Sequence, residues 1–351
     1  MKFRFARGRR DELATLHPAC FAMVMATGIV AIAAHLHDLP QVANALFWLN
    51  ALFLAVLVLA AGARLLRHRR EVAADLCSLS RGVGFFTMPA AAAVFGTQLD
   101  LQRGDVRLAT VFWVIAVVLW LCMTYGLLPV LATRRDKLPL AGALNGGWLV
   151  IVVAPQSVVI LAVLLAAHGA FAAYEPALMF AALTLWLAAG ALYLWVITLI
   201  VYRLAFLPLG PKDLSSPDWI NMGAVAISTL AGATLAEHAA LSPLVAEVVP
   251  FVKGLSLCFW AIATAWIPML IVLLAWRHLG AGVPIAYEVL DWGGVFPLGM
   301  YSASTYNMMT VVNAPFLAVV SKAFAVLALA AWLWVLAGFV VSRAAARPSP
   351  A

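Results

Sequence analysis

Charged residues are scarce in this sequence. Only 11% of its 351 residues are Asp, Glu, Lys or Arg, whereas 65% are hydrophobic. A soluble domain has about 25% charged and roughly 45–50% apolar residues. The composition therefore excludes an ordinary soluble domain. Apolar runs of about 20 residues, each long enough to span the hydrocarbon core of a bilayer, recur along the chain. We interpret the chain as a polytopic membrane protein.

Patterns typical of catalysis and metal binding are also missing. The four cysteines, Cys20, Cys77, Cys122 and Cys258, form no CxxC pair, so we expect neither a zinc site nor a structural disulfide. The sequence has no HExxH motif, no phosphate-binding loop and no Ser-His-Asp pattern in a suitable context. We therefore expect no enzyme activity, no metal and no cofactor.

Ten membrane spans can be placed, separated by short loops that leave no room for a soluble domain. We expect a cytosolic N-terminal tail at 1–17, one transmembrane transport domain at 18–341 and a cytosolic C-terminal tail at 342–351. The fold class is thus an all-α membrane protein built from five helical hairpins. The predicted spans are 18–36, 42–64, 82–99, 107–131, 146–168, 177–203, 219–237, 250–275, 287–308 and 315–341.

Lysine and arginine fall mostly on one side of this topology. All of the 22 except Arg103, Arg107, Lys253 and Lys322 lie in segments that share a side with the N-terminus. Cytosolic loops carry such an excess, so both termini are expected in the cytosol and the protein in the cell (inner) membrane. The bias also accounts for the net charge of +7, which needs no nucleic-acid partner.

The odd-numbered spans carry proline or glycine in the membrane at intervals of roughly one helical hairpin. These residues are Gly28, Pro89, Pro155, Gly223 and Pro297. We interpret them as kinks in five inner helices that line a central pore, because irregular backbone survives at membrane depth only when protein or a water-filled path covers it. The alternative is that proline and glycine are simply commoner in membrane helices.

Small hydroxyl residues cluster near the same positions, and we take Thr27, Ser157, Ser228 and Ser302 as candidates for pore lining. The even-numbered spans are bulkier and are expected to face lipid. A helix N-terminus carries partial positive charge, so such a pore can favour anions without a buried cation. Near the outer helix ends, Lys253 and Lys322 are candidates for attracting anions, although they can also snorkel to the interface.

Two segments resemble a known family. HPACFAMVMATGIVAIA, residues 17–33, and DWGGVFPLGMYSASTYNM, residues 291–308, resemble the first and ninth helices of the tellurite-resistance/dicarboxylate transporter family. That family includes bacterial tellurite-resistance proteins, yeast malate and sulfite permeases and plant slow anion channels. The resemblance implies a quasi-fivefold bundle around a central pore and a homotrimer with one pore per protomer. It also implies that Phe296 occludes the pore; by its residue type alone, Phe296 could equally be a core side chain.

These observations favour transport of small inorganic or organic anions across a lipid membrane. Candidate substrates are C4-dicarboxylates such as malate, tellurite-related oxyanions and chloride. A proton-coupled carrier that exports sulfite or another oxyanion is the alternative. An intramembrane enzyme would need paired carboxylates, histidines or cysteines at helical spacing, and a receptor would need longer loops or an extramembrane domain.

Overall fold

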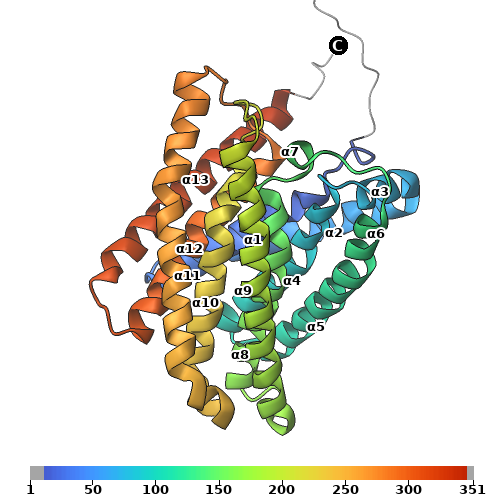
Figure 1. Cartoon of the computed structure of the whole chain (residues 1–351). Helices are drawn as coiled ribbons and strands as arrows, with labels where there is room; N and C mark the ends of the chain where they lie inside the picture. The colour runs from blue at the N-terminus through green and yellow to red at the C-terminus, as the bar shows by residue number, and fades with distance from the viewer. Residues whose placement is uncertain (1–11, 346–351) are drawn as a thin grey trace, which may run out of the picture.

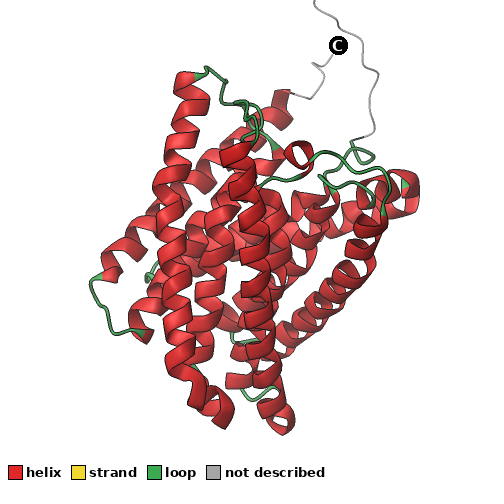
Figure 2. Cartoon of the chain, in the orientation of Figure 1, coloured by secondary structure: helices red, strands yellow, loops and turns green. Residues whose placement is uncertain are grey.

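The structure, a computed structural model, describes residues 12–345, and the regular elements in that range are all helical (Figure 2). Within this range nine helices are long and apolar enough to cross a membrane. A tenth, α12 (Trp292–Val311), has a similar length but is rich in glycine, serine, threonine and tyrosine. It contacts α1, α10, α11 and α13, and its side chains Ser302, Ser304 and Thr305 are fully buried among these helices.

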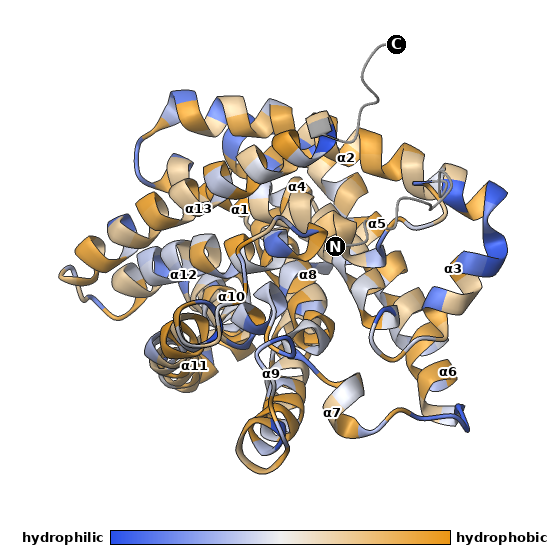
Figure 3. Cartoon of the chain, turned by 90° about the horizontal axis from the view of Figure 1, so that it is seen from above, coloured by the Kyte–Doolittle hydropathy of each residue, from blue (hydrophilic) through white to orange (hydrophobic). Residues whose placement is uncertain are grey.

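Five short helices form the interior of the bundle. Each contacts the next, α1 with α4, α4 with α8, α8 with α10 and α10 with α12, and α12 contacts α1 to close the ring (Figure 3). In four of them, 83–100% of the most apolar stretch is buried. The inner helices are α1 (Ala22–Leu36), α4 (Thr87–Arg103), α8 (Val150–Ala167), α10 (Ile220–Glu237) and α12 (Trp292–Val311).

Longer helices surround this ring and leave only 17–39% of their apolar stretches buried. Their exposed faces are apolar, as expected for helices that face lipid (Figure 3). The outer helices are α2 (Pro40–Arg67), α5 (Val106–Cys122) continued by η3 (Met123–Leu127) and α6 (Leu128–Thr133), α9 (Glu175–Phe206), α11 (Pro243–Ala275) continued by η8 (Trp276–Gly280), and α13 (Leu317–Ala345).

All five inner helices begin at the same end of the bundle, which we call the N-face; the opposite end is the C-face. The short helices α3 (Arg69–Leu76) and α7 (Leu140–Ala143) also lie on the N-face, at the top of Figure 1. A 3-10 turn precedes each inner helix, and these turns contact one another in a second closed ring. The turns are η1 (Pro18–Phe21), η2 (Gly82–Phe86), η4 (Gly146–Leu149), η6 (Ser216–Trp219) and η9 (Val289–Asp291).

The all-helical fold and the positions of the predicted spans are confirmed, and the outer helices run longer than predicted. For example, α11 with η8 covers Pro243–Gly280, whereas the predicted span is 250–275. The predicted C-terminal tail begins inside α13, which continues to Ala345. Most of the predicted N-terminal tail, residues 1–11, lies outside the described residues, as does 346–351.

The predicted kink positions all lie on inner helices, but the helices run through them without interruption. Pro89 is the third residue of α4, where a backbone N–H has no helical partner to lose. Pro155 and Pro297 lie deeper and each remove one helical hydrogen bond. Their helices nevertheless continue on both sides of the proline.

The two glycines serve close packing rather than bending. A Cβ atom on Gly28 would lie 2.5 Å from Val94 Cγ1 of α4, and one on Gly223 would lie 2.8 Å from Pro297 Cγ of α12. Both distances are too short for a real Cβ atom, so α1 and α10 reach their neighbours in the ring only because these residues lack one.

Candidate functional site

One stripe of side chains on each inner helix faces the axis of the ring, at helical spacing. On α8 the stripe contains Val150, Val153, Ser157 and Ile160. The stripes border two successive cavities along the axis, each lined by residues from all five inner helices or the turns that precede them. A narrow path with this lining is what a transport route along the bundle requires.

The first cavity is a vestibule of about 60 Å³ that opens at the N-face. The deepest lining residue of each helix forms its floor, and Phe296 is the largest of the five and only 2% exposed. The neighbouring floor side chains are small or aliphatic, so the Phe296 ring is the bulkiest obstacle there. The floor residues are Met25, Thr87, Val153, Ile220 and Phe296.

The second cavity holds about 20 Å³ and lies further toward the C-face. Met300, one helical turn after Phe296, lines it, so the turn between these residues separates the two cavities. A single water needs roughly 10–15 Å³ of such space, so this cavity has little room for a hydrated ion. Its lining residues are Ile29, Ile32, Val94, Thr97, Ser157, Ile160, Ile227, Leu230 and Met300.

No Asp, Glu, Lys or Arg among the described residues lines either axial cavity. The electrostatic feature of the vestibule is instead the convergence of five helix N-termini, each of which presents partial positive charge. Side chains cap several of these turns. The Nδ1 of His17 accepts a hydrogen bond from the Ala19 amide at 3.1 Å, and Asn145 Oδ1 accepts one from the Gly147 amide at 2.9 Å.

Two acidic residues cap two further turns, η6 and η9. Asp218 Oδ1 accepts a hydrogen bond from the Gly146 amide at 3.0 Å, which ties η6 to η4, and its Oδ2 accepts one from the Ser215 amide at 2.7 Å. Asp291 accepts hydrogen bonds from Ser216 Oγ and from the Glu288 amide, which ties η9 to η6. Neither carboxylate lines the vestibule, so these groups brace its rim without placing a negative side chain on the path.

His17 is the titratable side chain of the vestibule lining, and it lies beside a buried ion-pair cluster. Arg64 and Arg81 both donate to Asp75, at 2.8 Å and 2.6 Å. Burial would raise the pKa of Asp75, but these hydrogen bonds hold it below its usual value. Burial, followed by the nearby Arg81 charge, lowers the pKa of His17 to about 4. The imidazole is therefore neutral at pH 7.

The structure brings one of the four candidate lining hydroxyls to the axis. Ser157 lines the second cavity. Thr27, Ser228 and Ser302 are fully buried and line neither axial cavity, and each of their side chains contacts a neighbouring helix. Thr27 Oγ1 accepts from Trp332 Nε1 of α13 at 3.0 Å.

The other two hydroxyls connect neighbouring helices in the same way. Ser302 and Ser321 exchange hydrogen bonds between hydroxyl and backbone carbonyl at 2.8 Å, which joins α12 to α13. Ser228 Oγ accepts from Gln156 Nε2 at 3.1 Å and donates to the Ala224 carbonyl. These hydroxyls hold helices together, since a polar group in this environment needs a partner.

The two candidate lysines lie on the outer helices rather than on the ring. Lys253 is on α11 and is partly exposed, while Lys322 is on α13 and is exposed. Neither lines an axial cavity. Lys322 is near the start of α13 on the C-face, and Lys253 lies about three turns into α11 from the same face. A long side chain at such a position can extend toward the membrane surface.

Sequence reasoning missed the capping residues of the N-face and the vestibule residue His17. The sequence does contain a pattern that indicates them. Ahead of several inner helices, a side chain able to cap a helix stands directly before a turn that contains Gly, Pro or Trp. Examples are HPACF, NGGWL and SSPDW. Such turns start helices. Their recurrence at three of the five hairpins would have indicated the N-face ring.

The comparisons with known proteins agree with this architecture. Residues 15–340 match the SLAC1 family, described as voltage-dependent anion channel. Two Methanocaldococcus jannaschii proteins, both named uncharacterized transporter, are 24% identical over 82% and 84% of this chain and the same shares of their own lengths. An uncharacterized membrane protein of Mycobacterium tuberculosis is 39% identical over 40% of this chain and 71% of its own length.

The family match covers nearly the whole described bundle, including all five inner helices and both axial cavities. The two archaeal relatives extend over most of the same range. The chain is therefore an integral membrane protein that belongs to the SLAC1 family of anion channels and transporters.

Proposed function

We propose that this protein conducts small anions along the axis of the inner ring, with Phe296 as the side chain that closes the path. The observation that carries the proposal is the vestibule: five helix N-termini converge on a cavity that contains no fixed charge and ends at an aromatic ring. Partial positive charge attracts anions, while the absence of a buried lysine or arginine avoids a tight binding site that would trap them.

The proposed gate acts by excluding water. Phe296 fills the floor of the vestibule against aliphatic side chains such as Met25 and Val153, so no hydrated ion passes while the ring stays there. Rotation of the side chain breaks no ion pair and no hydrogen bond. Pro297 follows directly and removes a backbone hydrogen bond from this turn of α12, which leaves the turn easier to shift.

The lining supports passive conduction rather than proton coupling, because proton-driven carriers use titrating carboxylates or histidines on the substrate path. No carboxylate among the described residues lines the axial cavities, and His17, the histidine at the vestibule, is neutral at pH 7 because its pKa is lowered to about 4. We take small anions of the family type as substrates: chloride, malate-like C4-dicarboxylates, and sulfite or tellurite-related oxyanions. The proposal also includes a homotrimer in the cell membrane with the N-face in the cytosol. The excess of basic residues on that face supports this orientation.

Flux measurements on purified protein in liposomes test the function. Vesicles are loaded with chloride, malate, sulfite or tellurite, and efflux is followed with and without an imposed pH gradient. We expect flux of at least one anion above that of empty liposomes, unchanged by the pH gradient. Flux that requires the gradient supports the proton-coupled carrier instead, and no flux of any of the four anions contradicts the proposal.

A further inference from the structure

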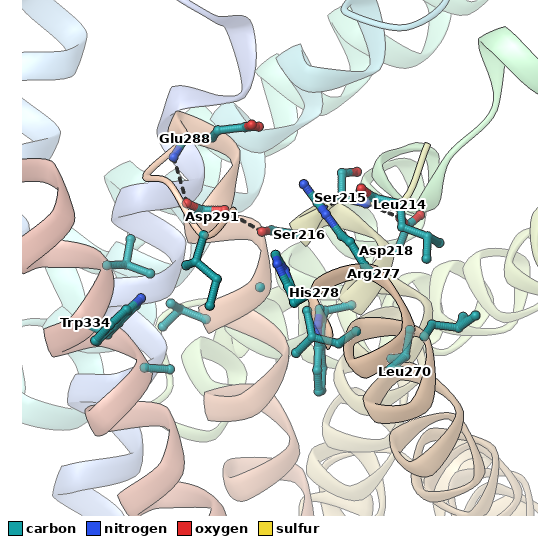
Figure 4. A pocket seen from close by; sticks show the side chains of 18 of the residues that line it. Leu214, Ser215, Ser216, Asp218, Leu270, Arg277, His278, Glu288, Asp291 and Trp334 are labelled. Carbon is teal, nitrogen blue, oxygen red and sulfur yellow. Dashed lines mark hydrogen bonds between the residues drawn. The ribbon is translucent and has the colours of Figure 1, made fainter. Parts of the chain in front are cut away.

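A third cavity, larger than the two axial cavities, lies off the axis. It holds about 340 Å³ and lies at the side of the bundle near the N-face, between η6, the end of α11 with η8, the start of α12, and α13 (Figure 4). It shares no lining residue with the vestibule. Neighbouring residues instead face opposite cavities: Val295 lines the lateral one and Phe296 the vestibule.

The polar end of this lateral cavity offers hydrogen-bond capacity that the protein leaves unused. Arg277 donates through Nη1 to the Leu214 carbonyl at 2.5 Å, but its Nε is buried without a partner. The Nδ1 of His278 lies 2.7 Å from the Val283 carbonyl oxygen, so Nδ1 carries the donated proton and the other ring nitrogen is free. The positive charge of Arg277 has a neutral carbonyl as its hydrogen-bond partner, so an anionic oxygen is the group that this end lacks.

Carboxylates stand beside these basic groups. Asp218, Glu288 and Asp291 all line the cavity. Asp218 and Asp291 use both oxygens to cap the turns of the N-face, yet their charges remain. Glu288 is exposed at the rim, as Figure 4 shows. A simple anion would meet three carboxylates here, and a simple cation would leave Arg277 unsatisfied.

The rest of the cavity is apolar and open toward the lipid-facing surface. Leu270, Leu273 and Leu274 of α11 form one wall, and Trp334 and Val335 of α13 form the other. Trp334 is 70% exposed, and an exposed tryptophan beside charged residues is typical of the membrane interface. The cavity therefore runs from a zwitterionic end at the N-face to a hydrocarbon-like end within the bilayer.

We propose that this cavity binds a membrane phospholipid with a phosphoethanolamine headgroup. The lipid phosphate would accept from Arg277, and its primary ammonium would donate to Glu288 and lie near the charge of Asp291. An acyl chain would lie between α11 and α13 against the leucines. A quaternary ammonium cannot donate a hydrogen bond to Glu288, and an uncharged glycerol headgroup brings no positive charge to balance the carboxylates. The site should therefore prefer phosphatidylethanolamine over phosphatidylcholine and phosphatidylglycerol.

Native mass spectrometry of the purified protein with each of the three lipids tests the proposal. We expect phosphatidylethanolamine to be retained at least about fivefold more than the other two. Arg277→Gln should abolish that preference, whereas Arg67→Gln, which changes an exposed arginine on the same face, should leave retention within about twofold. Equal retention of phosphatidylglycerol, or equal effects of the two substitutions, would overturn the proposal.

A second variant separates lipid binding from folding, because Arg277 also holds the Leu214 carbonyl. Leu274 is 43% exposed on α11, so Leu274→Trp fills the apolar end without touching the polar groups. It should lower phosphatidylethanolamine retention by about fivefold in a protein with unchanged thermal stability. Soluble phosphoethanolamine should not compete at millimolar concentration. Competition by soluble phosphoethanolamine would contradict a lipid site. The absence of retained lipid because a second copy of the protein covers the cavity would contradict it as well.

Discussion

The close approach of α10 and α12 depends on Gly223, which has a hydrogen atom in place of a side chain. The ring of Pro297 occupies the space that a Cβ atom there would need, and proline cannot rotate away from it. Because Phe296 directly precedes Pro297, the same contact sets the position of the aromatic ring at the vestibule floor. The contact between Gly223 and Pro297 thus determines both the spacing of these two helices and the position of Phe296 at the vestibule floor.

We expect Gly223→Ala to destabilise the folded protein by about 1–3 kcal/mol, the usual cost of an overpacked core. Gly62→Ala on the outer helix α2 is the matched control, since nothing lies within 4 Å of a Cβ atom there and alanine favours a helix over glycine. Thermal unfolding in detergent measures both. A Gly223→Ala protein as stable as the control would mean that the helices are not in contact at this point.

His17 gives the N-face a pH dependence with a definite sign. Its pKa is lowered to about 4 by burial and by Arg81, while the unfolded chain has a value near 6.5. Below pH 6.5 the unfolded state takes up a proton that the folded state resists, so stability falls between about pH 6.5 and 4, by roughly 2–3 kcal/mol.

The variant His17→Asn keeps an acceptor for the Ala19 amide and removes the titration. Its melting temperature should therefore decline less than that of the wild type between pH 7 and 4. Both proteins retain the Asp75 cluster, so a parallel decline in the two would assign the pH dependence to other groups.

At the scale of helices, the membrane spans and their order could be predicted from apolar length, because lipid imposes that length. The face of an inner helix that meets the axis could not be predicted in this way. An outer helix has a lipid side, but α8 is buried all round, so its sequence has no polar or apolar face to read. For this reason Ser157 and Ser228 looked equivalent, although one lines the axial cavity and the other bonds between helices.

Thiol labelling distinguishes these two serines. In a protein whose four native cysteines are replaced by alanine, Ser157→Cys should react with a small water-soluble reagent. Ser228→Cys, equally buried but turned toward Gln156, should react at least about tenfold more slowly. Adding Phe296→Ala, which is expected to open the path, should accelerate labelling of Ser157→Cys but not of Ser228→Cys. Equal rates at both serines are not compatible with an axis lined by the residues described above.

At the scale of the whole molecule, the ring of N-termini and most of the basic residues share one face, and the proposal assigns that face to the cytosol. Cys77 is exposed between α3 and η2 on this face. In intact cells it should resist a membrane-impermeant maleimide and react after permeabilisation. Ala170→Cys, exposed on the C-face, should show the opposite behaviour. Labelling of Cys77 in intact cells would mean that the N-face lies outside the cell, which contradicts the proposed orientation.

The resemblance selected Phe296 as the proposed gate, whereas its neighbours on the vestibule floor could not be predicted from the sequence. The motif VFPLGMY identifies the residue, but Met25, Thr87 and Val153 come from separate helices whose register only tertiary packing sets. The vestibule is therefore a property of the assembled ring rather than of any one segment, and its test must be made on the whole protein.

The central claim is that Phe296 closes an anion path, and anion flux per folded protein tests it most directly. Phe296→Ala is compared with wild type and with Phe259→Ala, a buried phenylalanine of α11 that packs on Trp186 away from the axis. Truncating a core phenylalanine costs about 3–5 kcal/mol and adds no conductance, so the control should lose stability only. The account predicts that Phe296→Ala raises flux at least about tenfold; a folded Phe296→Ala protein that conducts no better than wild type would contradict it.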